Sequence, residues 1–340
     1  MATLTISEIL RGCTPGRIQS VGYMQVIPLT ATKDMTDDRI VSPAKMSSMR
    51  TTDYGSMSIK NESDKIMIVP SQAAYVVKQA AQDHALPHVG IIGKKKSKSF
   101  DTARCIQENQ GGYISSGNHK MAILPFMLRE PAHKERSERD YSKLWSAIRR
   151  LNNETKAGNI GNLVHFLDKF KDELDQFIAE FEPVPNQVGA IILINGKVVG
   201  VERAPNYEYW TEIWPALIRE CYGSLALIEA KNNNGEIPVP KTRSVLGEVS
   251  SLADLAKAVK DAESRELENV RSVFGGVSET EMKRDGKDSG SSGLTIESLS
   301  HKRFVGQIVR EDEKIIYGSL IATSKWRTNE DWYMAKSFSL

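Results

Sequence analysis

The sequence contains little cysteine. Its 340 residues include three, Cys13, Cys105 and Cys221, which lie far apart along the chain. A sparse, odd-numbered set excludes a disulfide framework and is typical of a reducing compartment. The first ten residues, MATLTISEIL, also lack the charged start and apolar core of a secretory signal. We therefore expect a cytoplasmic protein.

The chain also lacks a strong net charge and a long apolar run. Its 45 basic and 43 acidic residues leave a net charge of +2 at pH 7. This balance gives no general attraction to nucleic acid or anionic lipid, so we expect neither as a partner. No apolar stretch approaches the ~20 residues that a membrane helix needs. Hydrophobic residues make up 40% and charged residues 26%, which is typical of a folded globular protein.

The most informative stretch is PVPNQVGAIILINGKVVGVE, which spans Pro183–Glu202. Gly189–Ile194 is apolar on both faces, which predicts a strand that is covered on both sides. Asn195 and Gly196 are residues that tolerate the positive φ of a type I′ turn. Lys197–Val201 then predicts the paired strand. The centre of the chain is therefore expected to be a β-hairpin in a folded core.

Four segments have the apolar spacing of helices that could cover such a sheet. They are Asp140–Leu151, Asn159–Phe181, Asn206–Ala230 and Ser251–Phe274. The second has the clearest period of 3.6, with an apolar stripe and charged residues on the opposite side. In the third, Pro215 predicts either a kink or the start of a second helix.

Shorter segments carry the β-branched and aromatic residues of strands. They are Ile18–Leu29, two strands within Ser56–Val69, Val89–Ile92, Phe304–Val309 and Ile315–Thr323. The polar segment Thr30–Tyr54 predicts a loop over the core. Ser71–His84 suits a helix capped by Ser71, although its Tyr75-Val76-Val77 run also suits a strand.

These elements predict one α+β domain over residues 1–340, with a mixed β-sheet flanked by helices. The C-terminal strands are expected to rejoin that sheet. Residues 275–293, which end in KRDGKDSGSSG, are then a flexible excursion loop within the domain. No period of 20–50 residues repeats, which excludes a solenoid.

The loop GIIGKKKSKS, Gly90–Ser99, has the composition of a phosphate-binding loop but not its spacing. That motif needs four residues between its glycines and a Ser or Thr directly after its lysine. Here two residues separate Gly90 from Gly93, and Lys95 follows Lys94. We interpret the segment as a solvated basic loop that could draw an anionic ligand toward a nearby pocket.

A second polar group, QDHALPH, contains Asp83, His84 and His88. Two histidines four residues apart share a face only on a helix, and Pro87 lies between these two. No third metal ligand is near. We therefore expect surface or capping histidines and no zinc site.

Two further groups are candidate sites. In DTARCIQENQGG, Arg104 lies beside Cys105 and shortly before Glu108, but no histidine is near. A packed or merely exposed thiol is therefore favoured over a nucleophile. Glu202 and Arg203 follow the hairpin at a strand end, where α/β folds often place ligand groups. The alternative for them is a surface ion pair.

Five segments resemble one known family. They are KQAAQDHAL (Lys78–Leu86), ARCIQENQGG (Ala103–Gly112), KLWSAIRRLN (Lys143–Asn152), PVPNQVGAIILINGKVVGVE and YEYWTEIWPALIRECY (Tyr207–Tyr222). The chain thus resembles a prokaryotic and viral family named for its genomic association with ADP-ribosylglycohydrolases and rhodanese-like phosphatases. Where that family has a Gly-Ala-Lys-Gln-Asn-Arg type of segment, this chain has Gln79–His84, so the basic residue at its end becomes His84.

The resemblance implies a link to NAD or ADP-ribose metabolism, often in phage–host conflict. We therefore expect a binding module for an ADP-ribose-type or NAD-type nucleotide, with no additional cofactor and no metal. Its ribose or base contacts are expected at Gln82, Asp83, Glu108 and Glu202, with His84 in the same site. Its phosphate contacts are expected at Arg104, Lys94 and Lys95.

Two other classes stay open. One is an interaction protein, such as a phage-encoded inhibitor, that docks on a protein partner through Arg129–Arg150 or Ser251–Phe274. The other is a hydrolase of ADP-ribosyl linkages, which needs a water-activating carboxylate or a metal that the sequence does not assemble. The sequence therefore leaves open whether this protein is an enzyme.

Overall fold

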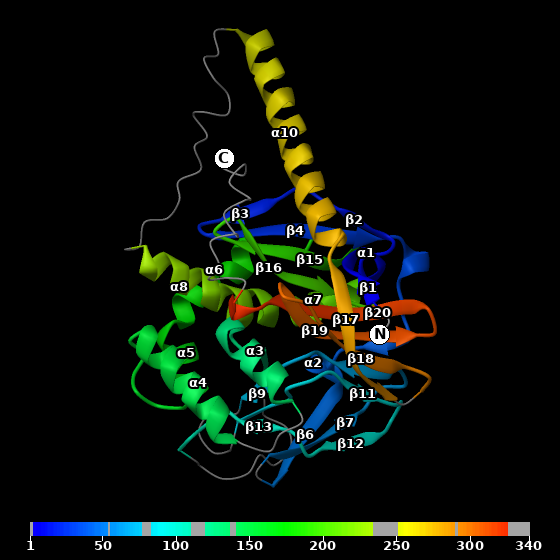
Figure 1. Cartoon of the computed structure of the whole chain (residues 1–340), viewed down its shortest axis with the longest axis vertical. Coiled ribbons are helices and arrows are strands. Elements are labelled where there is room, and N and C mark those ends of the chain that lie inside the picture. Colours follow the sequence, from blue (N-terminus) through cyan, green and yellow to red (C-terminus); the bar gives the residue numbers. More distant parts are fainter. Residues whose placement is uncertain are drawn as a thin grey trace.

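The largest feature of the fold is an antiparallel sheet of ten strands (Figure 1). The computed structural model describes residues 3–53, 55–76, 83–109, 120–136, 141–233, 251–289 and 292–325. Nine strands follow one another in the order β1 (Thr3–Thr5), β17 (Glu281–Ser289), β18 (Thr295–Ser300), β19 (Phe304–Glu311), β20 (Lys314–Ala322), β16 (Lys197–Arg203), β15 (Gln187–Ile194), β4 (Met24–Ala31) and β2 (Cys13–Pro15). The tenth, β3 (Gln19–Val21), also pairs with β4. With helices on this sheet, the α+β fold class is confirmed.

The predicted central hairpin is confirmed. Strands β15 and β16 pair antiparallel, from Gly189 opposite Arg203 to Ile194 opposite Lys197. Between them, Asn195 and Gly196 have φ angles of 52° and 72°, as a type I′ turn requires. Every residue of β15 is buried, which explains why the segment is apolar on both faces.

The C-terminal strands rejoin the sheet, as the sequence predicts. β20 pairs with β16 on one side and with β19 on the other. The prediction of a loop over residues 275–293 is wrong for residues 275–289, which form the end of a helix and a strand. Helix α10 (Leu252–Ser278) runs into it, and β17 follows. This segment therefore joins a long helix to a strand of the main sheet.

Three smaller sheets pack near the main one. Their orders are β13 (Arg104–Cys105), β10 (His84–Ala85), β9 (Ala73–Val76), β14 (Lys120–Ile123); β11 (Gly90–Ile92), β8 (Ile66–Val69), β5 (Ile40–Val41); and β12 (Ser97–Phe100), β7 (Ser56–Asn61), β6 (Ser47–Asp53). The pairing of β5 with β8 is parallel. Strands β7, β8 and β11 confirm the strands predicted in this region.

Two segments in this part of the chain differ from a prediction. For Ser71–His84 the helix is wrong and the alternative, a strand that includes Tyr75, is confirmed as β9; β10 begins at His84, and residues 77–82 lie outside the described part. The loop expected over residues 30–54 contains the 3₁₀ helix η1 (Lys33–Met35), β5, helix α2 (Pro43–Met46) and β6. Tertiary pairing overrides local propensity at both places.

The helices follow the sequence prediction more closely. α4 (Tyr141–Glu154) is confirmed, whereas the helix expected over Asn159–Phe181 is two, α5 (Leu163–Lys169) and α6 (Lys171–Glu180). The helical run from Tyr207 is α7 (Tyr207–Ala216), the π-helix η2 (Leu217–Tyr222) and α8 (Gly223–Asn232). The wider π-helical turn comes directly after Pro215, which has no N–H and clashes with the carbonyl four residues earlier.

The core lies between the sheet and these helices. Trp210 and Trp214 of α7 stack there with ring centroids 4.8 Å apart, and the Trp214 indole donates to the Phe181 carbonyl at 2.6 Å. Both tryptophans therefore anchor the core. Helices α1 (Ile6–Ile9) and α3 (Phe126–Lys134) also contribute buried apolar residues.

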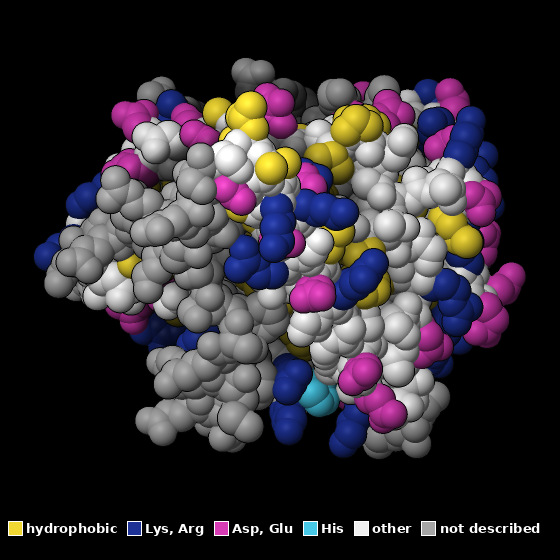
Figure 2. Space-filling model, turned by 90° about the horizontal axis from the view of Figure 1, so that it is seen from above, with side chains coloured by type: hydrophobic (Ala, Val, Ile, Leu, Met, Phe, Trp, Pro, Cys, Tyr) yellow, Lys and Arg dark blue, Asp and Glu magenta, His cyan; other side chains and the backbone are white. Residues whose placement is uncertain are grey.

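On the described part of the face in Figure 2, no side-chain charge of one sign forms a continuous patch. Basic and acidic side chains are interspersed there, with hydrophobic side chains emerging between them. In Figure 1, α10 projects away from the body of the molecule. Within the described ranges, no helix combines the length and the apolar character that a membrane crossing demands.

Candidate functional site

Two of the sequence-predicted site residues lie on paired strands, and a third, Asp83, directly precedes one of these strands. His84 lies opposite Cys105, and Arg104 lies opposite Ala85, on β10 and β13. Asp83, His84 and Arg104 are all at most 1% exposed, and the Arg104 guanidinium donates to the Glu135 carbonyl. Gln82 lies outside the described residues. The structure thus brings these three residues into one buried neighbourhood.

Glu108 lies three residues after β13, and its carboxylate contacts other residues of the chain. Its carboxylate forms an ion pair with Arg149 of α4 and accepts a hydrogen bond from the Gly161 amide at 2.8 Å. It therefore ties the segment after β13 to α4 and to the turn before α5.

Glu202 lies on β16, inside the main sheet, and is 2% exposed. It accepts from Arg129 of α3 at 2.9 Å and from the Tyr222 hydroxyl of η2 at 2.6 Å. Arg129, 1% exposed, also donates to Gln72 at 2.9 Å and to Ser319 at 2.6 Å. Burial opposes the charge on Arg129, but the nearby Cys221 and Glu202 raise its pKa well above its usual value.

Lys94 and Lys95 lie elsewhere, in the exposed turn between β11 and β12. The Lys95 ammonium donates to the Glu62 carbonyl at 2.7 Å and lies 3.7 Å from the Asp64 carboxylate. The predicted residues are therefore distributed over several places, with most of them engaged in contacts inside the protein. Their role in ligand binding stays a prediction.

The buried histidine next to this network predicts a pH dependence. Burial, together with Arg136 and Arg129, lowers the pKa of His133 to about 3. In the unfolded chain its pKa is about 6.5. Between these values the unfolded state binds more protons, so the free energy of unfolding should fall as the pH drops from about 6.5 toward 3. The expected slope is at most about 1.4 kcal/mol per pH unit for one proton.

Urea unfolding between pH 7.5 and pH 4 measures this slope. Because carboxylates titrate in the same range, the informative comparison is between variants. His133→Gln should flatten the curve, whereas His165→Gln, which changes an exposed histidine, should leave it unchanged. Equal slopes for the wild type and His133→Gln would show that the His133 pKa is not lowered.

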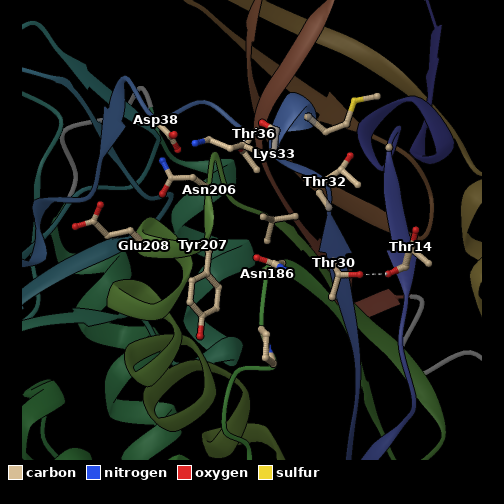
Figure 3. Close-up of a pocket in the computed structure, with 15 residues that line it drawn as sticks. Thr14, Thr30, Thr32, Lys33, Thr36, Asp38, Asn186, Asn206, Tyr207 and Glu208 are labelled. Atoms are coloured by element: carbon tan, nitrogen blue, oxygen red, sulfur yellow. Dashed lines mark hydrogen bonds between the residues drawn. The ribbon is translucent and has the colours of Figure 1, made fainter.

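A pocket of about 740 Å³ opens at one end of the main sheet (Figure 3). It lies where β4 ends, β15 begins and β16 leads into α7. In the close-up Thr14, Thr30 and Thr32 lie on the right, and Asp38, Asn206 and Glu208 lie on the left. The polar lining residues are Thr14, Thr30, Thr32, Lys33, Thr36, Asp38, Asn186, Asn206, Tyr207 and Glu208.

Local structure holds this pocket open. Asn206 caps α7 by accepting from the Tyr209 amide at 2.8 Å, and its own amide donates to the carbonyls of Asp37 and Ile40. This fixes the segment between η1 and β5 against the start of α7. On the opposite side, Thr30 donates to the Thr14 carbonyl across the β2–β4 pairing. The lining therefore stands on rigid elements.

A second pocket, of about 290 Å³, adjoins the first, because Met35 lines both. Its basic lining residues are Arg11, Arg203, Arg310 and Lys314, and its acidic ones are Glu8, Asp34 and Glu313. Arg203 is 5% exposed and donates to the carbonyls of Ile9 and Arg11 at 2.5 and 2.8 Å. Within the described residues no carboxylate lies within 4 Å of it, and burial lowers its pKa.

Sequence reasoning did not identify the first pocket. Its residues come from four separated segments, and one of them, the polar run TATKDMTDD, was expected to be only a loop over the core. That run of hydroxyl and charged residues directly after a strand is the one local signal for the site. Arg203 was a candidate from its place at a strand end, and it does line a pocket.

The fold and its pockets define an α+β protein with one large antiparallel sheet and a polar pocket at its end. The chain belongs to the ARG and Rhodanese-Phosphatase-superfamily-associated Protein domain family (ARPP-1), whose model matches residues 12–320. The resemblance seen in the sequence is thus confirmed. Its name associates the family with ADP-ribosylglycohydrolases and rhodanese-phosphatase superfamily proteins. Searches of curated proteins and of solved structures gave no match.

Proposed function

We propose that this protein binds an ADP-ribose-type or NAD-type nucleotide across the two adjoining pockets. One observation carries the proposal. A pocket rich in hydroxyl and carboxylate groups adjoins a pocket rich in guanidinium groups, and Met35 lines both. Such a ligand has the matching parts, because its ribose carries hydroxyls and its diphosphate carries negative charge.

The first pocket suits the base and a ribose. The carboxylates of Asp38 and Glu208 can accept hydrogen bonds from ribose hydroxyls. Tyr207 is 41% exposed, so its ring is free to stack on a base. The volume of about 740 Å³ lies within the roughly 300–1,000 Å³ of small-molecule sites.

The second pocket suits the diphosphate. A guanidinium binds phosphate through paired hydrogen bonds, and Arg203 is a buried guanidinium that a carboxylate does not neutralise within the described part of the chain. A bound anion would compensate that charge. Arg11 and Lys314 are exposed at the same pocket and can add to the attraction.

Thermal unfolding against ADP-ribose, NAD, ADP, ribose 5-phosphate and inorganic phosphate tests the proposal. A ligand at a hundredfold excess over its dissociation constant stabilises by about 2.7 kcal/mol. We expect ADP-ribose or NAD to raise the midpoint and phosphate alone to raise it less. Lys33→Met, which removes the ammonium of the first pocket, should reduce the shift. If none of these compounds moves the midpoint, the proposal fails.

A protein-docking role is the second candidate, and α10 favours it. This projecting helix exposes Leu252, Leu255, Val259 and Leu267, with Leu252 86% exposed. An exposed apolar stripe of this kind marks a contact surface. Two results together would favour docking over nucleotide binding. The first is that no nucleotide shifts the unfolding midpoint. The second is one stoichiometric partner that binds the wild type but not Leu252→Ser/Leu255→Ser. In either role, we propose phage–host conflict as the setting.

A further inference from the structure

A third pocket, of about 340 Å³, lies between the smaller sheets and strands β17 to β19 of the main sheet. His88 enters it from the residues before β11, and Thr102 enters it from the residues after β12. Lys98 and Phe100 of β12 line it as well. Neither of the other two pockets shares a lining residue with it.

The hydrogen bonds of His88 define its tautomer. Its Nδ1 lies 2.9 Å from the Val89 carbonyl oxygen, and its Nε2 lies 2.7 Å from the Thr102 hydroxyl. A carbonyl oxygen can only accept, so Nδ1 carries a proton. Burial lowers the pKa of His88, which keeps the ring neutral near pH 7. Its Nε2 is then unprotonated, so Thr102 must be the donor.

Other contacts hold the ring in this orientation. The Val89 amide donates to the Gln307 side-chain oxygen at 2.8 Å, and the Gln307 amide donates to Ser298 at 3.1 Å. The carbonyl that orients His88 is therefore anchored to β18 and β19. The Phe100 ring lies against the imidazole, with centroids 5.9 Å apart. A hydroxyl, a base and a group that orients the base are the parts of an activated nucleophile.

We propose that Thr102 and His88 are the nucleophile and the general base of a second site, which hydrolyses carboxylic esters with a small acyl group. Val89, Phe100 and Ile296 give the pocket apolar surface for such a group. Lys98, which lines the same pocket, supplies positive charge for the oxyanion. This site is independent of the nucleotide proposal.

The reaction balances with water as the co-reactant. The Thr102 oxygen bonds to the acyl carbon while its proton passes to His88 Nε2. The ester C–O bond then breaks, and the departing alkoxide takes that proton as the alcohol leaves. In the second half, His88 takes a proton from water as the water oxygen attacks the acyl–threonine ester. The acid is released, and the proton returns to Thr102.

Labelling with a fluorophosphonate, followed by peptide mass mapping, tests the proposal. In the wild type we expect one adduct, on the peptide that contains Thr102. Thr102→Val should abolish it, and His88→Gln should slow it by about a hundredfold or more. Thr211→Val, which changes a hydroxyl on α7 that lines none of the three pockets, should label like the wild type. Thermal unfolding confirms that each variant is folded.

A purely structural hydrogen bond gives a different result. In that case Thr102→Val lowers the unfolding midpoint, but the wild type carries no adduct on Thr102. That outcome overturns the proposal. An adduct that forms at the same rate in His88→Gln overturns it as well, because the base would then be unnecessary.

Discussion

Replacing Arg129 with methionine should lower the free energy of unfolding by about 3–5 kcal/mol, because it leaves a buried carboxylate without its cation. Arg129 and Glu202 are 1% and 2% exposed and lie 2.9 Å apart. The same change also removes the donors to Gln72 and Ser319. Urea unfolding at pH 7 measures the loss.

Two comparisons identify the cause of that loss. Arg129→Met/Glu202→Leu removes both charges, so it should be more stable than Arg129→Met alone. Lys171→Met breaks the exposed Lys171–Asp175 pair on α6 and should change stability little. A loss below about 1 kcal/mol for Arg129→Met would show that the pair is not what stabilises this region.

Gly189→Ala should destabilise the protein by about 3 kcal/mol, which is the upper end of the usual cost of adding volume to a packed core. An added Cβ at Gly189 would overlap the main-chain oxygen of Glu202 on the paired strand β16. Main-chain atoms at the centre of a sheet cannot move aside as the end of a side chain can. Thermal or urea unfolding gives the difference.

Gly276→Ala is the matched control, because it adds the same methyl group at a helical glycine. Within the described residues, no atom outside the neighbouring helix backbone lies within 4 Å of an added Cβ there. Alanine is favoured over glycine inside a helix by about 1 kcal/mol, so this variant should be slightly more stable than the wild type. A neutral Gly189→Ala would mean that β15 and β16 do not approach as closely as the structure has them.

The central hairpin was predictable because its signals are local. The apolar run of β15 and the Asn195-Gly196 turn act on neighbouring residues, so the sequence contains all that is needed. The long α4 and α10 were predictable for a similar reason, through their helical spacing.

Strand β17 shows why other elements were missed. Its sequence, EMKRDGKDS, is charged, and Met282 is its fully buried apolar residue. It forms a strand because β18 supplies a pairing partner, with only the three-residue β1 on its other side. Near a sheet edge a polar strand is tolerated and even favoured. Local composition therefore indicated a loop where long-range pairing makes a strand.

The candidate site was less predictable than the fold. Glu202 was expected to contact a ligand, and the structure places it in the interior, where it accepts a hydrogen bond from Arg129, 73 residues earlier in the chain. No spacing of residues near Glu202 in the sequence predicts such a partner. The lining of the first pocket likewise combines Thr14, Thr30, Asn186 and Tyr207. They meet because β2, β4, β15 and β16 are adjacent in the sheet and β16 leads into α7.

Calorimetric titration of ADP-ribose into the wild type, Arg11→Met and Lys94→Met is the most direct test of nucleotide binding in the adjoining pockets. Arg11 lines the second pocket, whereas Lys94 lies in the basic loop that the sequence predicted. We predict saturable binding by the wild type, at least about tenfold weaker binding by Arg11→Met, and unchanged binding by Lys94→Met. No heat of binding with the wild type, or a loss confined to Lys94→Met, would contradict it.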